Sequence, residues 1–417
     1  MTGDHASTVR RYLARMRCYK ENVRGSWLGY MWIAGSTLAA VVTLLVLEIV
    51  WHIQGRWSTG FEYSRGLLLS VFATAIVGVM LAIQEVRPVV SRLMSLHDVL
   101  GLRVAEDSRT ARSERRTLLV LPTFLAHDER EPPGLPIGTI KWRGDTDERC
   151  FVRHDVILAT EIAELLSQHG LPPPLIKGDR EVVQELLAGR DNSPAEGIFI
   201  ASEGEKVRVQ DVIVVGLFSN AVTWAIAYGH GWEKLAEQPA PLELQINPHA
   251  VVGTDDDRLA ADNRSLVVRY EDNLDERSSW LKETFPFTKW RSDHDDAMQE
   301  FEPALVMRLQ LADVNAVILG GVSATGTARL GDFFKRDGGF ERLRWHPSAP
   351  GRNSGPLVKK ASSYWFVLKC PGHHLRHREA DIERAGGLHP RADVRLSQLI
   401  TLASEASVES ADHELAS

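Results

Sequence analysis

The sequence has little of what builds a disulfide framework or a nucleic-acid surface. It contains 3 cysteines, Cys18, Cys150 and Cys370, which are odd in number and far apart. Such usage excludes a disulfide scaffold and suits a reducing compartment. Lys and Arg total 48 against 55 Asp and Glu, a net charge of -7. Without a general excess of positive charge, we expect no nucleic-acid partner.

The usual signatures of hydrolytic enzymes are also missing. The chain has no Gly-x-Ser-x-Gly elbow and no His-Glu-x-x-His pair. A carboxylate pair such as Glu271 and Asp272 could serve glycosidic-bond chemistry on a nucleotide, although a structural salt bridge is the commoner role. Catalytic residues therefore stay unassigned.

Metal ligands gather at one place, near the end of the last expected strand: Cys370, His373, His374 and His377. No second ligand pair at zinc-finger spacing accompanies them. We therefore expect no metal site and no other cofactor, and interpret the cluster as an exposed loop.

Two long apolar runs lie near the N-terminus. Residues 27–51 carry one charge, Glu48, and exceed the roughly 20 residues that a helix needs to span a bilayer. Residues 66–83 carry none, and tryptophans and a tyrosine flank the runs as in aromatic belts. These features favour a two-helix transmembrane hairpin over 27–84 rather than a buried hairpin of a soluble core.

The flanking charges predict the orientation of this hairpin. Arginine and lysine are abundant in residues 1–26 and 85–116, whereas the connecting loop contains only Arg56 and Arg65. By the positive-inside rule, both chain ends lie in the cytosol. We expect a multi-pass protein of the cytoplasmic (inner) membrane, with the lipid bilayer as a partner.

Small residues recur at every fourth position in both apolar runs: Gly35, Ala39 and Thr43, then Ser70, Thr74, Gly78 and Ala82. Such stripes let helices pack closely in lipid, either within one chain or between chains of a homo-oligomer. Residues 89–104 are expected to form an amphipathic helix. This helix either lies on the inner leaflet of the membrane, relays movement from the soluble domain, or only connects the hairpin to that domain. The polar run 105–116 completes this juxtamembrane segment.

Strand and helix patterns alternate through residues 117–400. Continuous apolar strands are expected at 117–124, 211–220 and 314–321, and helical periodicity at 154–170 and 179–189. Further strand candidates are 242–246, 265–270, 303–311 and 363–369. The pattern predicts an α/β fold: a doubly wound, mainly parallel, Rossmann-like cytosolic domain. Residues 401–417 are polar and predict a disordered tail.

Three loops follow expected strands, at 122–123, 216–220 and 320–327, and ligands of open α/β sheets sit beyond such strand ends. Gly321 and Gly326 have Walker A spacing, but Thr327 and Ala328 stand where that motif needs Lys and then Ser or Thr. The glycines also miss the dinucleotide-binding spacing. Neither P-loop ATP hydrolysis nor ordinary NAD binding is predicted.

A small anionic ligand remains possible, because backbone N–H groups and hydroxyls before a helix can converge on a phosphate, ribose or carboxylate. The candidate ligand-binding residues are Gly216, Ser219, Asn220, Gly320, Gly321, Ser323, Thr325, Gly326 and Thr327. The alternative is that these loops only turn the chain, with Ser219, Asn220, Thr325 or Thr327 capping helices.

The stretches "ILGG" and "GT" at a strand-to-helix turn, within residues 315–335, resemble the Rossmann-like nucleotide-sensing domains of prokaryotic conflict and signalling systems. These domains are related to the lysine-decarboxylase-like and DprA-like groups, and often follow a membrane hairpin. The spacing departs from the PGGxGTxxE form, since four residues separate Gly321 from Gly326 and no matching Glu follows Thr327. The resemblance implies a nucleotide-like ligand sensed in the cytosol with an output at the membrane.

We therefore expect a membrane-anchored sensor or effector, whose cytosolic domain binds a small phosphorylated or nucleotide-like ligand and transmits to the membrane segment. Two alternatives stay open. One is a membrane-tethered enzyme acting on nucleosides or nucleotides through a carboxylate, and the other is a membrane scaffold for protein partners.

Overall fold

The fold was analysed in a computed structural model, which describes two compact units. Of the first unit, it describes isolated residues between Gly35 and Val77, all with helical backbone, together with Met94 and Leu171. The second unit is described at residues 95–102, 115–125, 149–168, 172–188, 197–202, 204–228, 231–236, 239–246, 264–272, 279–286, 288–291, 298–336, 338–347, 356–371, 379–388, 391 and 393–405.

The predicted transmembrane runs, 27–51 and 66–83, lie almost wholly outside the described residues. Among the residues that are described, no helix combines the length and apolar composition needed to cross a membrane. The hairpin, its orientation and its small-residue stripes therefore stay predictions.

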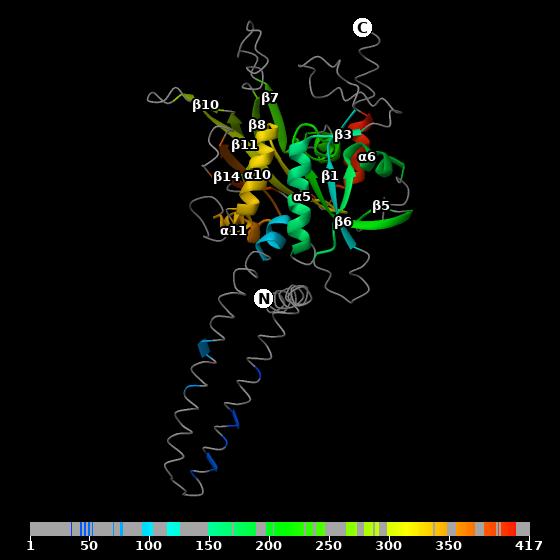
Figure 1. Ribbon diagram of the computed structural model, residues 1–417. Helices are drawn as coiled ribbons and strands as arrows, with labels where there is room; N and C mark the ends of the chain where they lie inside the picture. The colour runs from blue at the N-terminus through cyan, green and yellow to red at the C-terminus, as the bar shows by residue number, and fades with distance from the viewer. Residues whose placement is uncertain are drawn as a thin grey trace, which may run out of the picture. The chain divides into compact units, whose positions relative to one another are not determined.

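The second unit is a mixed α/β fold around a nine-stranded sheet (Figure 1). Its order is β14 (Asp381–Leu388), β13 (Ser363–Pro371), β11 (Met298–Gln310), β12 (Asn315–Gly321), β6 (Glu205–Val215), β1 (Arg115–Leu121) and β4 (Leu175–Gly178), with β10 (Thr288–Arg291) beside β11 and β5 (Ile198–Ser202) beside β6. Of the expected strands at 117–124, 211–220 and 314–321, the sheet contains residues 117–121, 211–215 and 315–321.

The four strands β4, β1, β6 and β12 are parallel and form the centre that the sequence predicts. β11 and β13 are antiparallel additions, although their apolar runs look like parallel strands in the sequence. The residues from Tyr364 to Leu368 in β13 are all buried, so this apolarity reflects a strand covered on both faces. Burial on both faces does not indicate whether a strand is parallel or antiparallel to its neighbours.

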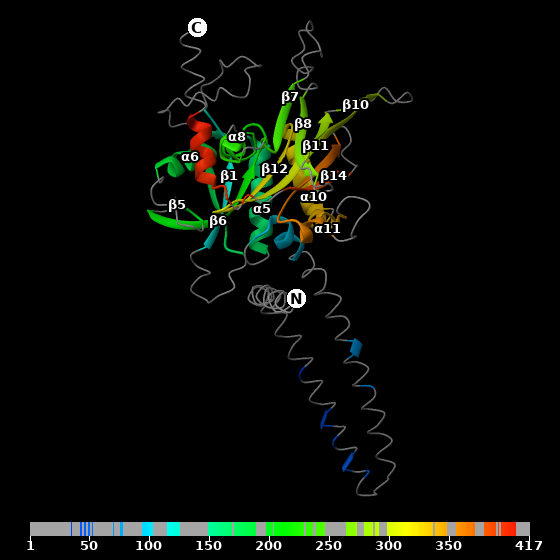
Figure 2. The same cartoon turned by 180° about the vertical axis from the view of Figure 1, so that it is seen from behind.

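Helices cover both faces of this sheet. α5 (Arg153–Gln168) and α10 (Ala324–Arg336) lie side by side on one face (Figure 1), whereas α6 (Asp179–Ala188) and the helical residues 396–405 lie on the other (Figure 2). The shorter helices are α7 (Ala221–Thr223), which continues as the π-helical turn η1 (Trp224–Tyr228), α8 (Gly231–Ala236), α11 (Gly339–Trp345) and α12 (Leu357–Lys360).

Two smaller sheets accompany the central one. β2 (Thr123–Leu125) pairs with β3 (Arg149–Phe151), and β7 (Leu242–Ile246), β8 (Arg264–Asp272) and β9 (Ser279–Pro286) form a three-stranded antiparallel sheet. The three-stranded sheet packs apolar side chains onto the core, where the rings of Tyr270 and Phe285 contact Trp365. Two expected strands, 242–246 and 265–270, thus lie outside the central sheet.

Residues 95–102, within the expected juxtamembrane helix, belong to the second unit and are buried in it. Asn315 at the start of β12 donates from Nδ2 to the carbonyl of Leu100 at 2.8 Å, and the Tyr364 hydroxyl donates to the carbonyl of Val99 at 2.5 Å. Leu96, Val99 and Leu100 are at most 1% exposed. This segment is therefore part of the amino edge of the parallel strands.

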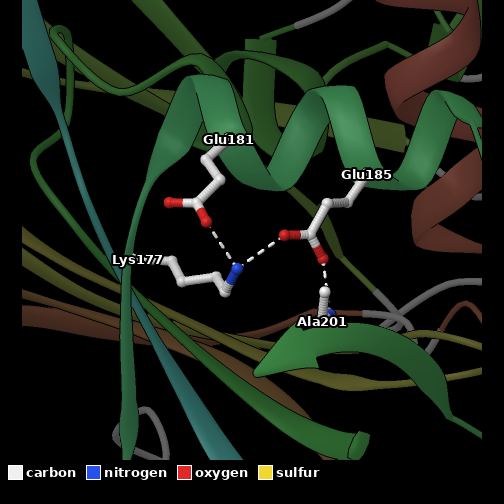
Figure 3. A network of polar contacts seen from close by, with 4 residues as sticks. All are labelled: Lys177, Glu181, Glu185 and Ala201. Carbon is white, nitrogen blue, oxygen red and sulfur yellow. Dashed lines mark hydrogen bonds and ion pairs between the residues drawn. The ribbon is translucent and has the colours of Figure 1, made fainter. Parts of the chain in front are cut away.

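At the β4 side of the sheet, one lysine forms ion pairs with two glutamates (Figure 3). Lys177 of β4 lies 2.5 Å from both Glu181 and Glu185 of α6, and Glu185 accepts the backbone N–H of Ala201 in β5 at 2.7 Å. The Lys177 side chain is 12% exposed, so this network is screened less than a surface ion pair. It fixes α6 against β4 and β5.

Candidate functional site

The parallel strands end together at one edge of the sheet, which we call the carboxyl edge: the ends of β4, β1, β6 and β12 and the residues that follow them. From β1 the chain passes to β4 on one side and then to β6 on the other, so the strand order reverses between β1 and β6. Open α/β sheets bind ligands at this reversal. The candidate site is therefore at the carboxyl edge.

The two loops that the sequence singles out touch each other here. The N–H of Gly216 donates to the carbonyl of Leu319 at 2.8 Å. A Cβ atom on Gly320 would lie 3.0 Å from the backbone nitrogen of Leu217, so only glycine allows this approach without a shift. Gly216 itself has a φ of 97°. The loops 216–220 and 320–327 thus form one surface.

Asp179 connects three strand ends. Its Oδ1 accepts the N–H of Thr123 at 2.9 Å, the Thr123 hydroxyl at 2.6 Å and the N–H of Arg180 at 2.8 Å. Its Oδ2 accepts the N–H of Ala221, the first residue of α7, at 2.7 Å. The side chain is buried, and four hydrogen bonds to one carboxylate compensate its removal from water.

Asn220 caps α7 and is fully buried. Its Oδ1 accepts the N–H groups of Val222 and Thr223, and its Nδ2 donates to the carbonyls of Val215 and Val120. This is the capping role that the sequence leaves open for Asn220. Its amide already has partners on both sides, so a ligand would have to replace one of them, and the ligand role stays a prediction.

The glycine-rich loop is closed by an acid from β11. Glu302 accepts the N–H of Ser323, and its Oε2 accepts the Ser323 hydroxyl at 2.7 Å. Ser323 in turn accepts the N–H of Thr325 at 3.1 Å. The Thr327 hydroxyl accepts the N–H of Gly321 at 3.0 Å and donates to the carbonyl of Ser323 at 3.2 Å. The N–H groups and hydroxyls that could bind a ligand anion therefore form hydrogen bonds within the protein.

The glycines of this loop permit close packing. A Cβ atom on Gly321 would collide with the backbone of Gly326, and one on Gly326 would collide with the carboxylate of Glu302. Glu302 is buried and sits at the start of α10, where the helix dipole favours negative charge. The protein's own carboxylate therefore takes the position that the sequence assigns to a ligand anion.

Two of the predicted hydroxyls remain available. Neither the side-chain hydroxyl of Ser219 nor that of Thr325 has a hydrogen bond within the described part of the chain, and both residues are partly exposed. Ser219 lies beside Gly216, since its Oγ would be 3.1 Å from a Cβ atom there. These two side chains can reach a ligand without breaking the loops.

A third acid, Asp155, is buried without a partner. Asp155, Leu158, Ala159 and Ile162 follow helical spacing on the face of α5 that packs against the sheet. Asp155 is 5% exposed, and no hydrogen bond or ion pair joins it to the described residues. Burial raises the pKa of its carboxyl to about 6. A carboxyl with such a pKa titrates close to neutral pH.

Asp155 belongs to the carboxyl edge. Phe151, at the end of β3, pairs with Thr123, and α5 begins two residues later. α5 and α10 each run back from this edge, and Glu161 of α5 lies 3.9 Å from Lys335 of α10. Asp155 precedes Glu161 by six positions, which places it about 9 Å nearer the edge along the helix axis.

Asp155, Asp179 and Glu302 are not among the residues that the sequence predicts for the site. A signal for Asp155 existed, because it shares the helical phase of Leu158 and Ile162 and is therefore a charged residue in an apolar stripe. The partners of Asp179 and Glu302 lie 42, 56 and 21 positions away, so only the fold brings them together.

The other sequence candidates lie elsewhere. Glu271 and Asp272 are on β8 of the three-stranded sheet. Cys370 is buried in β13, where burial raises the pKa of its thiol, and His373, His374 and His377 lie outside the described residues.

Comparisons with protein-family models, curated proteins and solved structures find no match to this chain.

Proposed function

We propose that the second unit binds a small nucleotide-like ligand at the carboxyl edge, between loops 216–220 and 320–327, and serves as the sensing domain of a membrane-anchored sensor or effector. The observation that supports this most is the contact between the two loops, through Gly216, Leu217 and Gly320, at the end of β6 and so beside the reversal of strand order between β1 and β6. The available hydroxyls of Ser219 and Thr325 supply hydrogen bonds to the ligand.

Strand β12 connects this site to residues 95–102, which follow in the sequence the membrane hairpin that we propose at 27–84. β12 begins at Asn315, which holds the carbonyl of Leu100, and ends at Gly321 in the ligand loop. Every residue of β12 is buried. A shift of this strand on ligand binding would therefore be felt by residues 95–102 and by the chain that precedes them.

The test is a thermal-shift and calorimetric screen of the full chain in detergent against nucleosides, nucleotides and cyclic nucleotides. Replacing both hydroxyls, in Ser219→Ala with Thr325→Ala, should weaken binding about thirtyfold, because each hydrogen bond contributes about 1 kcal/mol. Thr284→Ala is the matched control, since Thr284 is exposed on β9. A ligand that binds the double variant as tightly as the wild type lies elsewhere.

A second candidate function is an enzyme acting on nucleosides or nucleotides. Asp155 favours it, because a carboxyl with a pKa of about 6 can give or take a proton near neutral pH. Chromatography of nucleosides and nucleotides incubated with the protein decides: new products that depend on Asp155 indicate an enzyme, and unchanged compounds indicate a sensor.

A further inference from the structure

The three acids of the carboxyl edge differ in one respect. Asp179 accepts four hydrogen bonds and Glu302 accepts two from Ser323, so both carboxylates have polar partners inside the protein. Asp155 is only 5% exposed, yet it has no partner among the described residues. A buried carboxyl without a partner destabilises the fold, and such groups gather at functional sites.

The hydrogen-bonding groups of the carboxyl edge indicate what the partner of Asp155 must be. At the start of α7, the N–H groups of Ala221 and Val222 are already bonded to Asp179 and Asn220. At the start of α10, Glu302 accepts the N–H of Ser323, and the Ser323 hydroxyl accepts the N–H of Thr325. Among the described residues, the edge therefore has few N–H donors left for a phosphate and one carboxyl, Asp155, that lacks a donor.

We infer that Asp155 is a ligand-recognition residue of the proposed site. Its carboxyl accepts hydrogen bonds from the ribose diol of a nucleoside and does not bind a phosphate. This inference rests on the proposed function. The carboxyl of Asp155 accepts one or both ribose hydroxyls, and a phosphate on the 5′ position lies away from Glu302 and Asp155, whose negative charges repel it. The elevated pKa of Asp155 agrees with this role, because a bound donor replaces the water that burial removes.

The test uses the full chain in detergent and calorimetry with three sets of probes: the four ribonucleosides, the matching 2′,3′-dideoxynucleosides and inorganic phosphate. A ribonucleoside should bind the wild type at least tenfold more tightly than its dideoxy counterpart, and inorganic phosphate should not compete. Asp155→Asn and Asp155→Ser should lose at least tenfold in affinity for that ribonucleoside. Glu164→Gln, which changes an exposed acid of the same helix, should leave the affinity unchanged.

The outcomes separate this inference from the proposed function. Ribonucleoside binding that survives in both Asp155 variants, or that the dideoxy compound matches, overturns the role of Asp155 and leaves the site standing. A wild type that binds no nucleoside or nucleotide overturns the site and Asp155 together. The melting temperature gives a check that needs no ligand: Asp155→Asn should be at least as stable as the wild type, and a marked loss would show that Asp155 has a structural partner.

Discussion

Thr123 donates two hydrogen bonds to the same oxygen of Asp179, from its N–H at 2.9 Å and from its hydroxyl at 2.6 Å. This pair joins the end of β1 to the start of α6. The other oxygen of Asp179 holds the N–H of Ala221 at 2.7 Å, which adds the start of α7. One buried carboxylate thus sets the spacing of three loops at the carboxyl edge.

Asp179→Ala should therefore destabilise the second unit by about 3 to 5 kcal/mol, since it leaves the N–H groups of Thr123 and Ala221 buried and unpaired. Urea unfolding followed by tryptophan fluorescence measures the loss. Asp381→Ala is a suitable control, because that side chain is 79% exposed and its pair with Arg342 contributes little. An equal effect of the two changes would contradict the connecting role of Asp179.

The stability of the fold should decrease as Asp155 ionises. Its carboxyl has a pKa of about 6 in the folded chain, against an ordinary value of 3.8. The folded state therefore binds the proton more tightly, so the protein is favoured below pH 4 and loses stability as the pH rises to about 6 and above. Two pKa units correspond to about 3 kcal/mol.

Asp155→Asn cannot ionise, so its stability relative to the wild type should be nearly unchanged at pH 4 and higher by about 3 kcal/mol at pH 7. Unfolding curves of both proteins at several pH values measure this difference. A difference that does not change with pH would show that the Asp155 carboxyl is not selectively favoured in its protonated form.

Glu302 should keep inorganic anions away from the start of α10. Glu302→Ala removes the carboxylate that holds the N–H and hydroxyl of Ser323, and should cost about 2 to 4 kcal/mol of stability. The exposed N–H groups then form an anion site, so phosphate should raise the melting temperature of this variant. The wild type should respond to phosphate no more than to chloride at equal ionic strength, and an equal response of both proteins would contradict the prediction.

Local sequence features predicted much of the fold. The glycines at the ends of β6 and β12 correctly marked loops at the carboxyl edge, because a strand, a turn and a helix are set by neighbouring residues. The antiparallel direction of β11 and β13 was not accessible, since both are buried on two faces and have the apolar composition of parallel strands.

The polar contacts of the candidate site depend on distant residues. The sequence around Gly321 indicates an anion-binding turn, and in the structure a carboxylate accepts the N–H of Ser323 at this turn. That acid is Glu302 of the protein itself, brought there by the pairing of β11 with β12. No local pattern distinguishes a loop that binds a ligand anion from one that binds a carboxylate of its own chain.

Residues 95–102 should be required for a stable second unit. A chain that begins at residue 105 lacks the buried side chains of Leu96, Val99 and Leu100, and leaves the Asn315 amide without the carbonyl of Leu100. Burying each such side chain contributes about 1.5 to 3 kcal/mol. Residues 105–417 should therefore aggregate or melt well below residues 90–417 in thermal unfolding, and equal melting temperatures would show that the segment is dispensable.

The predicted hairpin at 27–84 leads to a separate prediction about membrane topology. Both flanking segments, 1–26 and 85–116, are rich in Arg and Lys, so the positive-inside rule places both chain ends in the cytosol. An alkaline phosphatase fused to the C-terminus should be inactive and a fluorescent protein at the same position should be bright, with the reverse pattern for fusions in the loop 52–65. Replacing Arg10, Arg11, Arg15 and Arg17 together with alanine should weaken this bias and raise the fraction of inverted chains, whereas an active phosphatase at the wild-type C-terminus would exclude the arrangement.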